Sequence, residues 1–171
     1  MKNRCQADMM ESNKNYQERI GELLYIGVNA RPDILAPVCI LSQHTTDPTI
    51  VDWTETKQIL KYLKGTMQFQ LKLGNIEERN TGLVAYSNAD WAQGRSDRKS
   101  ISRFLVQLHG STIAWGCRKQ TCVALSTTEA EYVALVETCK ELLWIHQILE
   151  DFDENITKPT TVLEDKAVSH Y

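Results

Sequence analysis

The segment from Ser126 to Phe152 constrains the fold most strongly, because it predicts one long helix with a single apolar side. Ser126 and Glu129 match a capping box, in which the serine accepts a hydrogen bond from the Glu129 backbone and the glutamate side chain reaches back. The predicted apolar stripe recurs at helical spacing and consists of Tyr132, Val133, Val136, Cys139, Leu142, Leu143, Ile145, Leu149 and Phe152. A helix with this pattern is expected to pack its stripe on one face of a sheet.

The flanking segments supply that sheet. Residues 83–86 (LVAY) predict a short buried strand, and residues 160–165 (TTVLED) predict another strand after the helix. Between them, residues 100–119 alternate apolar and polar side chains around His109-Gly110, which predicts an antiparallel hairpin. We therefore expect an α/β fold of the α+β type, in which a mixed sheet carries the long helix on one face.

The N-terminal part of the chain has a helical rather than a strand-like pattern. Apolar residues recur at helical spacing in two segments joined by a turn, and a third helix is predicted to end at Gly65. Pro37 should kink or delay the second helix, because proline removes a backbone donor. The expected organisation is a disordered leader (1–15), a helical segment (16–70), a linker (71–82) and a domain containing the strands (83–171).

Composition places few limits on the partners of the chain. The net charge of −3 neither supports nor excludes nucleic-acid binding. The first residues lack the apolar run of a secretory signal, and no stretch approaches the roughly 18 apolar residues of a membrane span. Five cysteines at scattered spacings fit a reducing compartment. We therefore expect an intracellular protein, cytoplasmic or nuclear, without a membrane partner.

Polar side chains are predicted to gather where the strands end. The first strand runs into Asn88 and Asp90, which share a face because side chains alternate along a strand. Glu131 lies in the first turns of the long helix, two residues after the capping Glu129, and Asp165 follows the last strand. Carboxylates brought together in this way suit a divalent metal, yet position 88 carries an amide instead of an acid.

Short motifs along the chain have a specific order and spacing. They read YSNADW, DRKS, a tryptophan and KQ in the hairpin, and LSTTEAEY, and they occupy Tyr86–Trp91, Asp97–Ser100, Trp115, Lys119–Gln120 and Leu125–Tyr132. These motifs resemble the ribonuclease H region of Ty1/copia-type retrotransposon Pol polyproteins, whose pattern reads Y-S-D-A-D-W, D-R-K/R-S, S-W, K-K-Q and L-S-x-x-E-A-E-Y. Residues 20–34 and 52–66 resemble the segment that joins reverse transcriptase to that region.

The resemblance implies a ribonuclease H-like fold, here truncated at its C-terminus, and a metal-dependent hydrolase. The family cleaves the RNA strand of an RNA–DNA hybrid with two magnesium ions held by about four carboxylates. Matching the motifs places the first carboxylate at position 88, the second at Glu131, the third at Asp165 and the fourth beyond Tyr171. Asn88 stands where the family has an aspartate, and Asp90 is a candidate substitute that lies roughly 6.5 Å further along the strand. Magnesium is therefore expected to bind weakly or not at all.

Three functions remain open from the sequence. The first is a copia-type Pol fragment whose ribonuclease H-like domain is catalytically impaired, with RNA–DNA hybrid and other retroelement or host proteins as partners. Arg103-Phe104, where the family has Gly-Tyr or Gly-Phe, is a further departure from the pattern. The second is a co-opted binding protein similar to the RxLR class of secreted pathogen effectors, since Glu77-Glu78-Arg79 resembles their EER element; only this function implies secretion. The third is an active ribonuclease H that uses Asp90.

Overall fold

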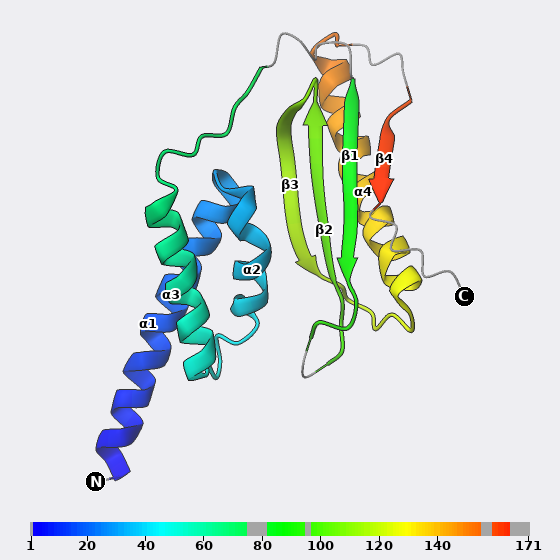
Figure 1. Cartoon of the computed structure of the whole chain (residues 1–171). Helices are drawn as coiled ribbons and strands as arrows, with labels where there is room; N and C mark the ends of the chain where they lie inside the picture. Colours follow the sequence, from blue (N-terminus) through cyan, green and yellow to red (C-terminus); the bar gives the residue numbers. More distant parts are fainter. Residues whose placement is uncertain (1, 75–81, 95–96, 155–158, 165–171) are drawn as a thin grey trace. The chain divides into compact units, whose positions relative to one another are not determined.

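The chain folds into two compact units, which divide between Leu71 and Lys72 (Figure 1). The computed structural model describes residues 2–74, 82–94, 97–154 and 159–164, with residues 2–12 described by their backbone alone. The division falls at the start of the expected linker. Helices and a mixed four-stranded sheet together confirm the predicted α/β class. Within the described ranges, no helix has both the length and the apolar character that a membrane crossing requires.

The first unit contains three helices, α1 (Lys2–Asn29), α2 (Pro32–Ser42) and α3 (Ile50–Gly65). Residues 2–15, which we expected to be a disordered leader, are instead helical in α1. These residues contain neither glycine nor proline and continue into a strongly helical segment, so adding them costs no new nucleation. Pro37 lies inside α2 without ending it. The buried core of this unit consists of Tyr16, Ile20, Leu23, Ile34, Val38, Leu41 and Ile59.

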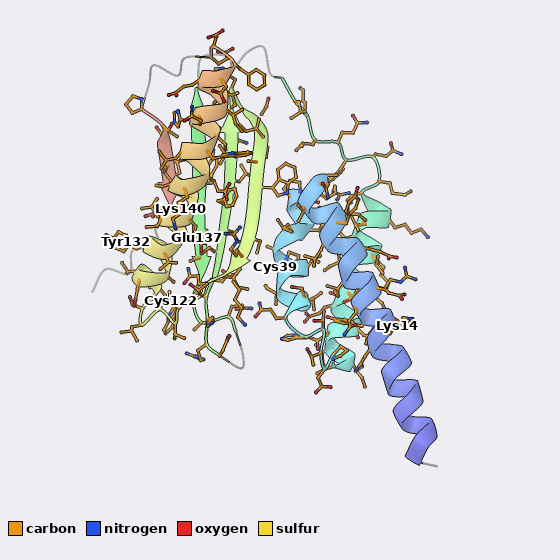
Figure 2. The ribbon with its side chains drawn as sticks, turned by 180° about the vertical axis from the view of Figure 1, so that it is seen from behind. Lys14, Cys39, Cys122, Tyr132, Glu137 and Lys140 are labelled. Atoms are coloured by element: carbon orange, nitrogen blue, oxygen red, sulfur yellow. The ribbon has the colours of Figure 1, made fainter. Side chains whose placement is uncertain are left out.

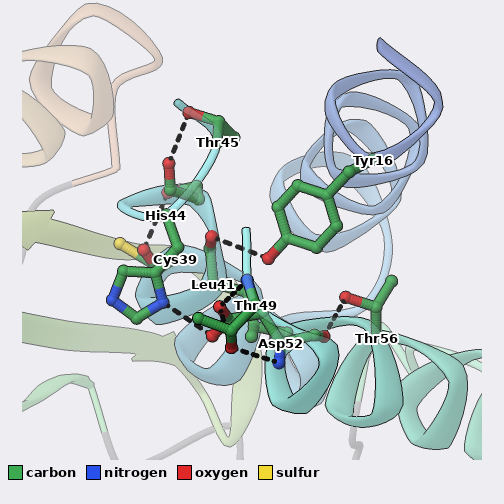
Figure 3. A network of polar contacts seen from close by, with 9 residues as sticks. Tyr16, Cys39, Leu41, His44, Thr45, Thr49, Asp52 and Thr56 are labelled. Atoms are coloured by element: carbon green, nitrogen blue, oxygen red, sulfur yellow. Dashed lines mark hydrogen bonds and ion pairs between the residues drawn. The ribbon is translucent and has the colours of Figure 1, made fainter. Parts of the chain in front are cut away.

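A buried carboxylate fixes the connection between α2 and α3 (Figure 3). Asp52 accepts hydrogen bonds from the backbone and the hydroxyl of Thr49 at 2.7 and 2.6 Å, and its own backbone donates to Thr49. His44 Nδ1 lies 2.8 Å from the other carboxylate oxygen. Burial by itself would raise the pKa of Asp52, but the bonds from Thr49 and His44 outweigh it and lower the pKa below its ordinary value of 3.8.

We expect Asp52 to make the stability of the full chain depend on acid pH. Because its folded pKa is lowered, Asp52 stabilises the fold above about pH 5 and loses that contribution as the pH falls through the folded pKa. Thermal unfolding followed by circular dichroism should show Asp52→Asn destabilised at neutral pH and less sensitive to acid than the parent chain. Asp47→Asn removes an exposed acid of the same loop and is the matched control; an equal effect of both variants would contradict the role of Asp52.

The second unit is a four-stranded sheet with strand order β3-β2-β1-β4 and one long helix. Strand β1 pairs antiparallel with β2 and parallel with β4, and β2 pairs antiparallel with β3. In chain order the elements are β1 (Leu83–Asp90), β2 (Ile101–Leu108), β3 (Ser111–Lys119), α4 (Thr127–Asp151) and β4 (Thr161–Glu164). This arrangement confirms the predicted mixed sheet, the hairpin and the fourth strand.

The hairpin turn and the length of β1 follow from local backbone and pairing. His109 and Gly110 have φ angles of 50° and 75°, and positive values at both central residues are typical of the type I′ turn that suits a two-residue hairpin. Strand β1 runs four residues beyond its predicted end at Tyr86, because its polar half pairs with the first half of β2 down to Asp90 opposite Ile101.

Helix α4 begins at the predicted cap, but only part of the predicted apolar stripe, including Leu142 and Ile145, lies on its buried face. The Ser126 side chain accepts from the Glu129 backbone at 3.1 Å, and the Glu129 carboxylate accepts from the Leu125 backbone at 2.6 Å. The buried face consists of Ala130, Ala134, Thr138, Leu142 and Ile145. Much of the predicted stripe is exposed, namely Tyr132, Val136, Cys139, Leu143 and Phe152. Apolar character alone could not identify the buried side, because α4 faces the sheet with small residues over its first half.

We expect two adjacent leucines of α4 to differ sharply in their effect on stability. Leu142 is buried against β1, whereas Leu143 is 72% exposed. Leu142→Ala should lower the free energy of unfolding by about 2–5 kcal/mol through lost burial and the cavity left behind. Leu143→Ala should change it by less than about 0.5 kcal/mol. Denaturant unfolding of the two variants measures the difference, and similar values would show that the face of α4 is assigned wrongly.

Candidate functional site

The end of β1 and the start of α4 lie at the same edge of the sheet. In Figure 1 the arrow of β1 ends at the edge where α4 begins, and the shorter β4 points toward the same edge. Trp91, the first residue after β1, donates from its indole nitrogen to the carbonyl of Ala124 at 3.0 Å. This hydrogen bond ties the end of the strand to the loop that leads into the helix, so strand-end and helix-start side chains are brought to one edge.

Gln120 fixes the first turn of α4 against the sheet. Its side-chain nitrogen donates to the carbonyl of Ala130 at 2.8 Å and to the hydroxyl of Ser102 at 3.0 Å, and the residue is 1% exposed. Its backbone nitrogen also donates to Ser100. Because Ala130 directly precedes Glu131, Gln120 sets the position of that acid along the sheet edge. The sequence motif contained Gln120, but no pattern in the sequence predicted this role.

The polar residues of β1 lie on two faces of the sheet. Ser87 is buried and its hydroxyl lies 3.1 Å from that of Thr138, so Ser87 points toward α4. By the alternation along a strand, Asn88 and Asp90 point to the opposite face. On that face Arg103 of β2 is paired directly with Asn88 in register and forms a salt bridge with Asp90. Sequence reasoning identified Asn88 and Asp90, and it noted Arg103 as a departure from the family pattern but not as their neighbour on this face.

Of the two remaining predicted ligands, the structure describes Glu131 but not Asp165. Glu131 is half-buried in the first turns of α4, at the edge where β1 ends. Asp165 lies outside the described residues, as do residues 77–79, on which the effector resemblance rests. In the described part of the chain, no three His, Cys, Asp or Glu side chains are grouped so that they could hold a metal ion. The magnesium ligand set therefore stays a prediction.

The loop after β1 is held by a second ion pair. Lys119 at the end of β3 lies 3.0 Å from the carboxylate of Asp97, and the lysine lowers the pKa of that carboxyl. The Asp97 carboxylate also accepts from the backbone of Lys99. The guanidinium of Arg98 lies 5.8 Å from the ring centre of Trp91. Two of the motifs found in the sequence, DRKS and KQ, thus contact each other and shape the edge of the candidate site.

We expect Gln120→Ala to loosen the start of α4. Losing the two side-chain bonds leaves the buried Ala130 carbonyl without its side-chain donor, which should lower stability by about 1–3 kcal/mol. Amide hydrogen exchange should accelerate most in the first turns of α4. Gln107→Ala, which removes a half-buried amide with one 3.4 Å bond on β2, is the matched control and should cost less than about 1 kcal/mol. Uniform exchange across α4 would refute the positioning role.

Comparison with known proteins identifies sequences similar to this chain, and three of them illustrate the result. The Retrovirus-related Pol polyprotein from transposon TNT 1-94 of Nicotiana tabacum is 39% identical over 136 residues, which cover 80% of this chain and 10% of that protein. The Retrovirus-related Pol polyprotein from transposon RE2 of Arabidopsis thaliana is 35% identical over 158 residues, which cover 91% of this chain and 10% of that protein. Secreted RxLR effector protein 161 of Plasmopara viticola is 39% identical over 133 residues, which cover 78% of this chain and 92% of that protein.

These similarities extend over most of the chain. No family model and no solved structure matches it. The chain spans about a tenth of the length of the Pol polyproteins that it matches, in contrast to nearly the full length of the effector protein. The resemblance seen in the motifs is therefore confirmed: over most of its length the chain is a homologue of a segment of Ty1/copia-type retrotransposon Pol polyproteins.

Proposed function

We propose that this chain is a Pol segment whose ribonuclease H-like domain does not cleave RNA–DNA hybrids. The observation that carries the proposal is Asn88, which stands at the end of β1 where the family has an acid. A neutral amide offers one oxygen ligand and no charge, so it cannot bridge two dications as a carboxylate does. Two adjacent magnesium ions repel each other strongly, and only a cluster of anionic oxygens holds them together.

The neighbourhood of Asn88 supports the same proposal. Arg103 replaces the glycine of the family pattern and is the cross-strand partner of Asn88. Its guanidinium places a fixed positive charge beside the position that a metal ion would occupy, and like charges in close proximity disfavour binding. The salt bridge to Arg103 also engages Asp90. For Asp90 to replace the lost ligand, it would have to leave Arg103 as a partly buried cation without its partner, which is costly.

The two departures from the family pattern should therefore be reversed together. Asn88→Asp alone puts a second acid next to Arg103, where an ion pair competes with metal. Asn88→Asp combined with Arg103→Gly removes that competition and should bind Mn²⁺ at least about tenfold more tightly than the parent chain, or roughly 1.4 kcal/mol. Paramagnetic broadening or calorimetric titration measures the affinity, with Arg103→Gly alone as the control for the charge change.

Hybrid cleavage provides the direct test. The purified parent chain should leave an RNA–DNA hybrid intact in magnesium or manganese. Cleavage by the parent chain that disappears in Glu131→Gln but persists in Glu137→Gln, an acid further along α4, would overturn the proposal. That result would make Asp90 the first ligand and the chain an active ribonuclease H. Cleavage that persists equally in both variants would instead point to a contaminating nuclease, and equal loss in both would point to damage to α4.

A second function is favoured by one specific observation. The similar effector of Plasmopara viticola is a separate protein, and this chain covers 92% of it at 39% identity. In this alternative the domain is reused for protein binding, and hydrolysis is not needed. The genomic surroundings separate the two: flanking integrase and protease reading frames favour the Pol segment, and an isolated gene with a secretory exon favours the effector.

A further inference from the structure

The exposed side of α3 carries a compact basic patch that includes one apolar residue. We call it the α3 patch; it consists of Lys57, Leu60, Lys61 and Lys64. Residues three and four positions apart are neighbours on a helix surface, so each member of this set lies next to two others. All four residues are exposed, and Leu60 is 40% exposed. The buried residues of α3 lie on a different side of the helix.

The lysines of the α3 patch have no acidic neighbour on their own helix. The acids of α3 are Asp52, which is buried and bonded to Thr49, and Glu55, whose spacing places it on another side. Among the residues that the structure describes, the lysines of the patch take part in no salt bridge. Helix α4 differs, because its Lys140 follows Glu137 by one turn on the same side (Figure 2). The α3 patch therefore presents uncompensated positive charge.

The spacing and chemistry of the α3 patch indicate what it can bind. From Lys57 to Lys61 the helix rises about 6 Å, and from Lys61 to Lys64 about 4.5 Å. Acids four and three residues apart on a helical segment repeat at the same intervals, so such a segment matches the patch in charge. Leu60 adds an apolar contact beside the charges, and an apolar contact within a polar rim is typical of protein–protein interfaces.

Nucleic acids and membrane surfaces fit the α3 patch less well. The unit that contains the patch, Met1–Leu71, has eight lysines and arginines and eight acids, so it lacks the net basic field that a phosphate backbone requires. A phosphate backbone would also make no use of Leu60. A helix that lies on a membrane needs a broad apolar face, whereas α3 buries Ile59 in the core of its own unit.

We propose that the α3 patch binds an acidic helical segment of a partner protein, with an apolar side chain of that segment against Leu60. The charges select the partner, and the apolar contact distinguishes it from other polyanions. The patch lies in the first unit and the candidate metal centre lies in the second. The proposal therefore does not depend on whether the chain cleaves RNA.

Three synthetic helical peptides test the proposal on the full chain. The first has glutamates four and three residues apart beside a leucine, the second has serine in place of that leucine, and the third has lysines in place of the glutamates. Fluorescence anisotropy at low ionic strength should show the first peptide binding about threefold more tightly than the second and at least about tenfold more tightly than the third. Raising the salt concentration should weaken binding of the first peptide, because exposed charges are screened.

Variants of the chain separate the α3 patch from general charge attraction. Lys57→Gln with Lys61→Gln should weaken binding of the first peptide at least about tenfold, and Leu60→Ser should remove its advantage over the serine peptide. Lys14→Gln with Lys72→Gln removes the same charge from exposed positions outside α3 and is the matched control. The control should change the affinity less than about twofold.

Four results would overturn the proposal. Equal weakening by the two pairs of lysine variants would show that the α3 patch is not the site. A preference for the leucine peptide that survives Leu60→Ser would show that Leu60 is not the apolar contact. Tighter binding of an oligonucleotide or of anionic lipid vesicles through the same lysines would identify a different class of partner. Sedimentation of the chain alone as a dimer that Lys61→Gln dissociates would identify a second copy as the occupant.

Discussion

The close approach of α4 to β1 is the contact on which the second unit depends. Ala130, Ala134 and Thr138 are small, lie four residues apart and are all buried. Small side chains let the helix backbone lie near the sheet, and the Thr138 hydroxyl then reaches the hydroxyl of Ser87 at 3.1 Å. Further along the helix, where Leu142 is buried, larger side chains fill the space. The helix is therefore anchored by contact with the strand at one end and by apolar burial at the other.

This anchoring determines where the candidate ligands lie but not what they are. The bonds of Gln120 to Ala130 and of Trp91 to Ala124 bring the helix start to the end of β1 without involving Glu131 or any side chain at position 88. Folding free energy comes from the buried residues, whereas Asn88 and Glu131 are only half-buried. A chain of this kind can lose a metal ligand and keep its fold, because stability and chemistry depend on different residues.

The sequence predicted correctly the features that depend on local signals. Its predictions failed for features that depend on tertiary packing. The helix cap at Ser126 and the His109-Gly110 turn follow from short-range chemistry, and both are present. The buried face of α4 was predicted only in part. Leu142 and Ile145 are buried as expected, but most of the first half of the stripe is exposed, because the helix has two apolar sides and only the sheet selects between them. Arg103 appeared in the sequence as a departure from the family pattern, yet its place opposite Asn88 follows from strand register, which no single segment reveals.

The register of β1 and β2 also places two departures from the family pattern, Asn88 and Arg103, opposite each other, although they look independent in the sequence. An aspartate at position 88 would face Arg103, and the guanidinium would hold its carboxylate in an ion pair with charge-assisted hydrogen bonds. A glycine at position 103 beside Asn88 would remove the competing cation but leave the metal without an anionic ligand. Either change alone therefore already weakens a two-metal centre, and once one is present the other costs little further metal affinity. In this protein Arg103 forms an ion pair with Asp90, which lies on the same face of the sheet as Asn88.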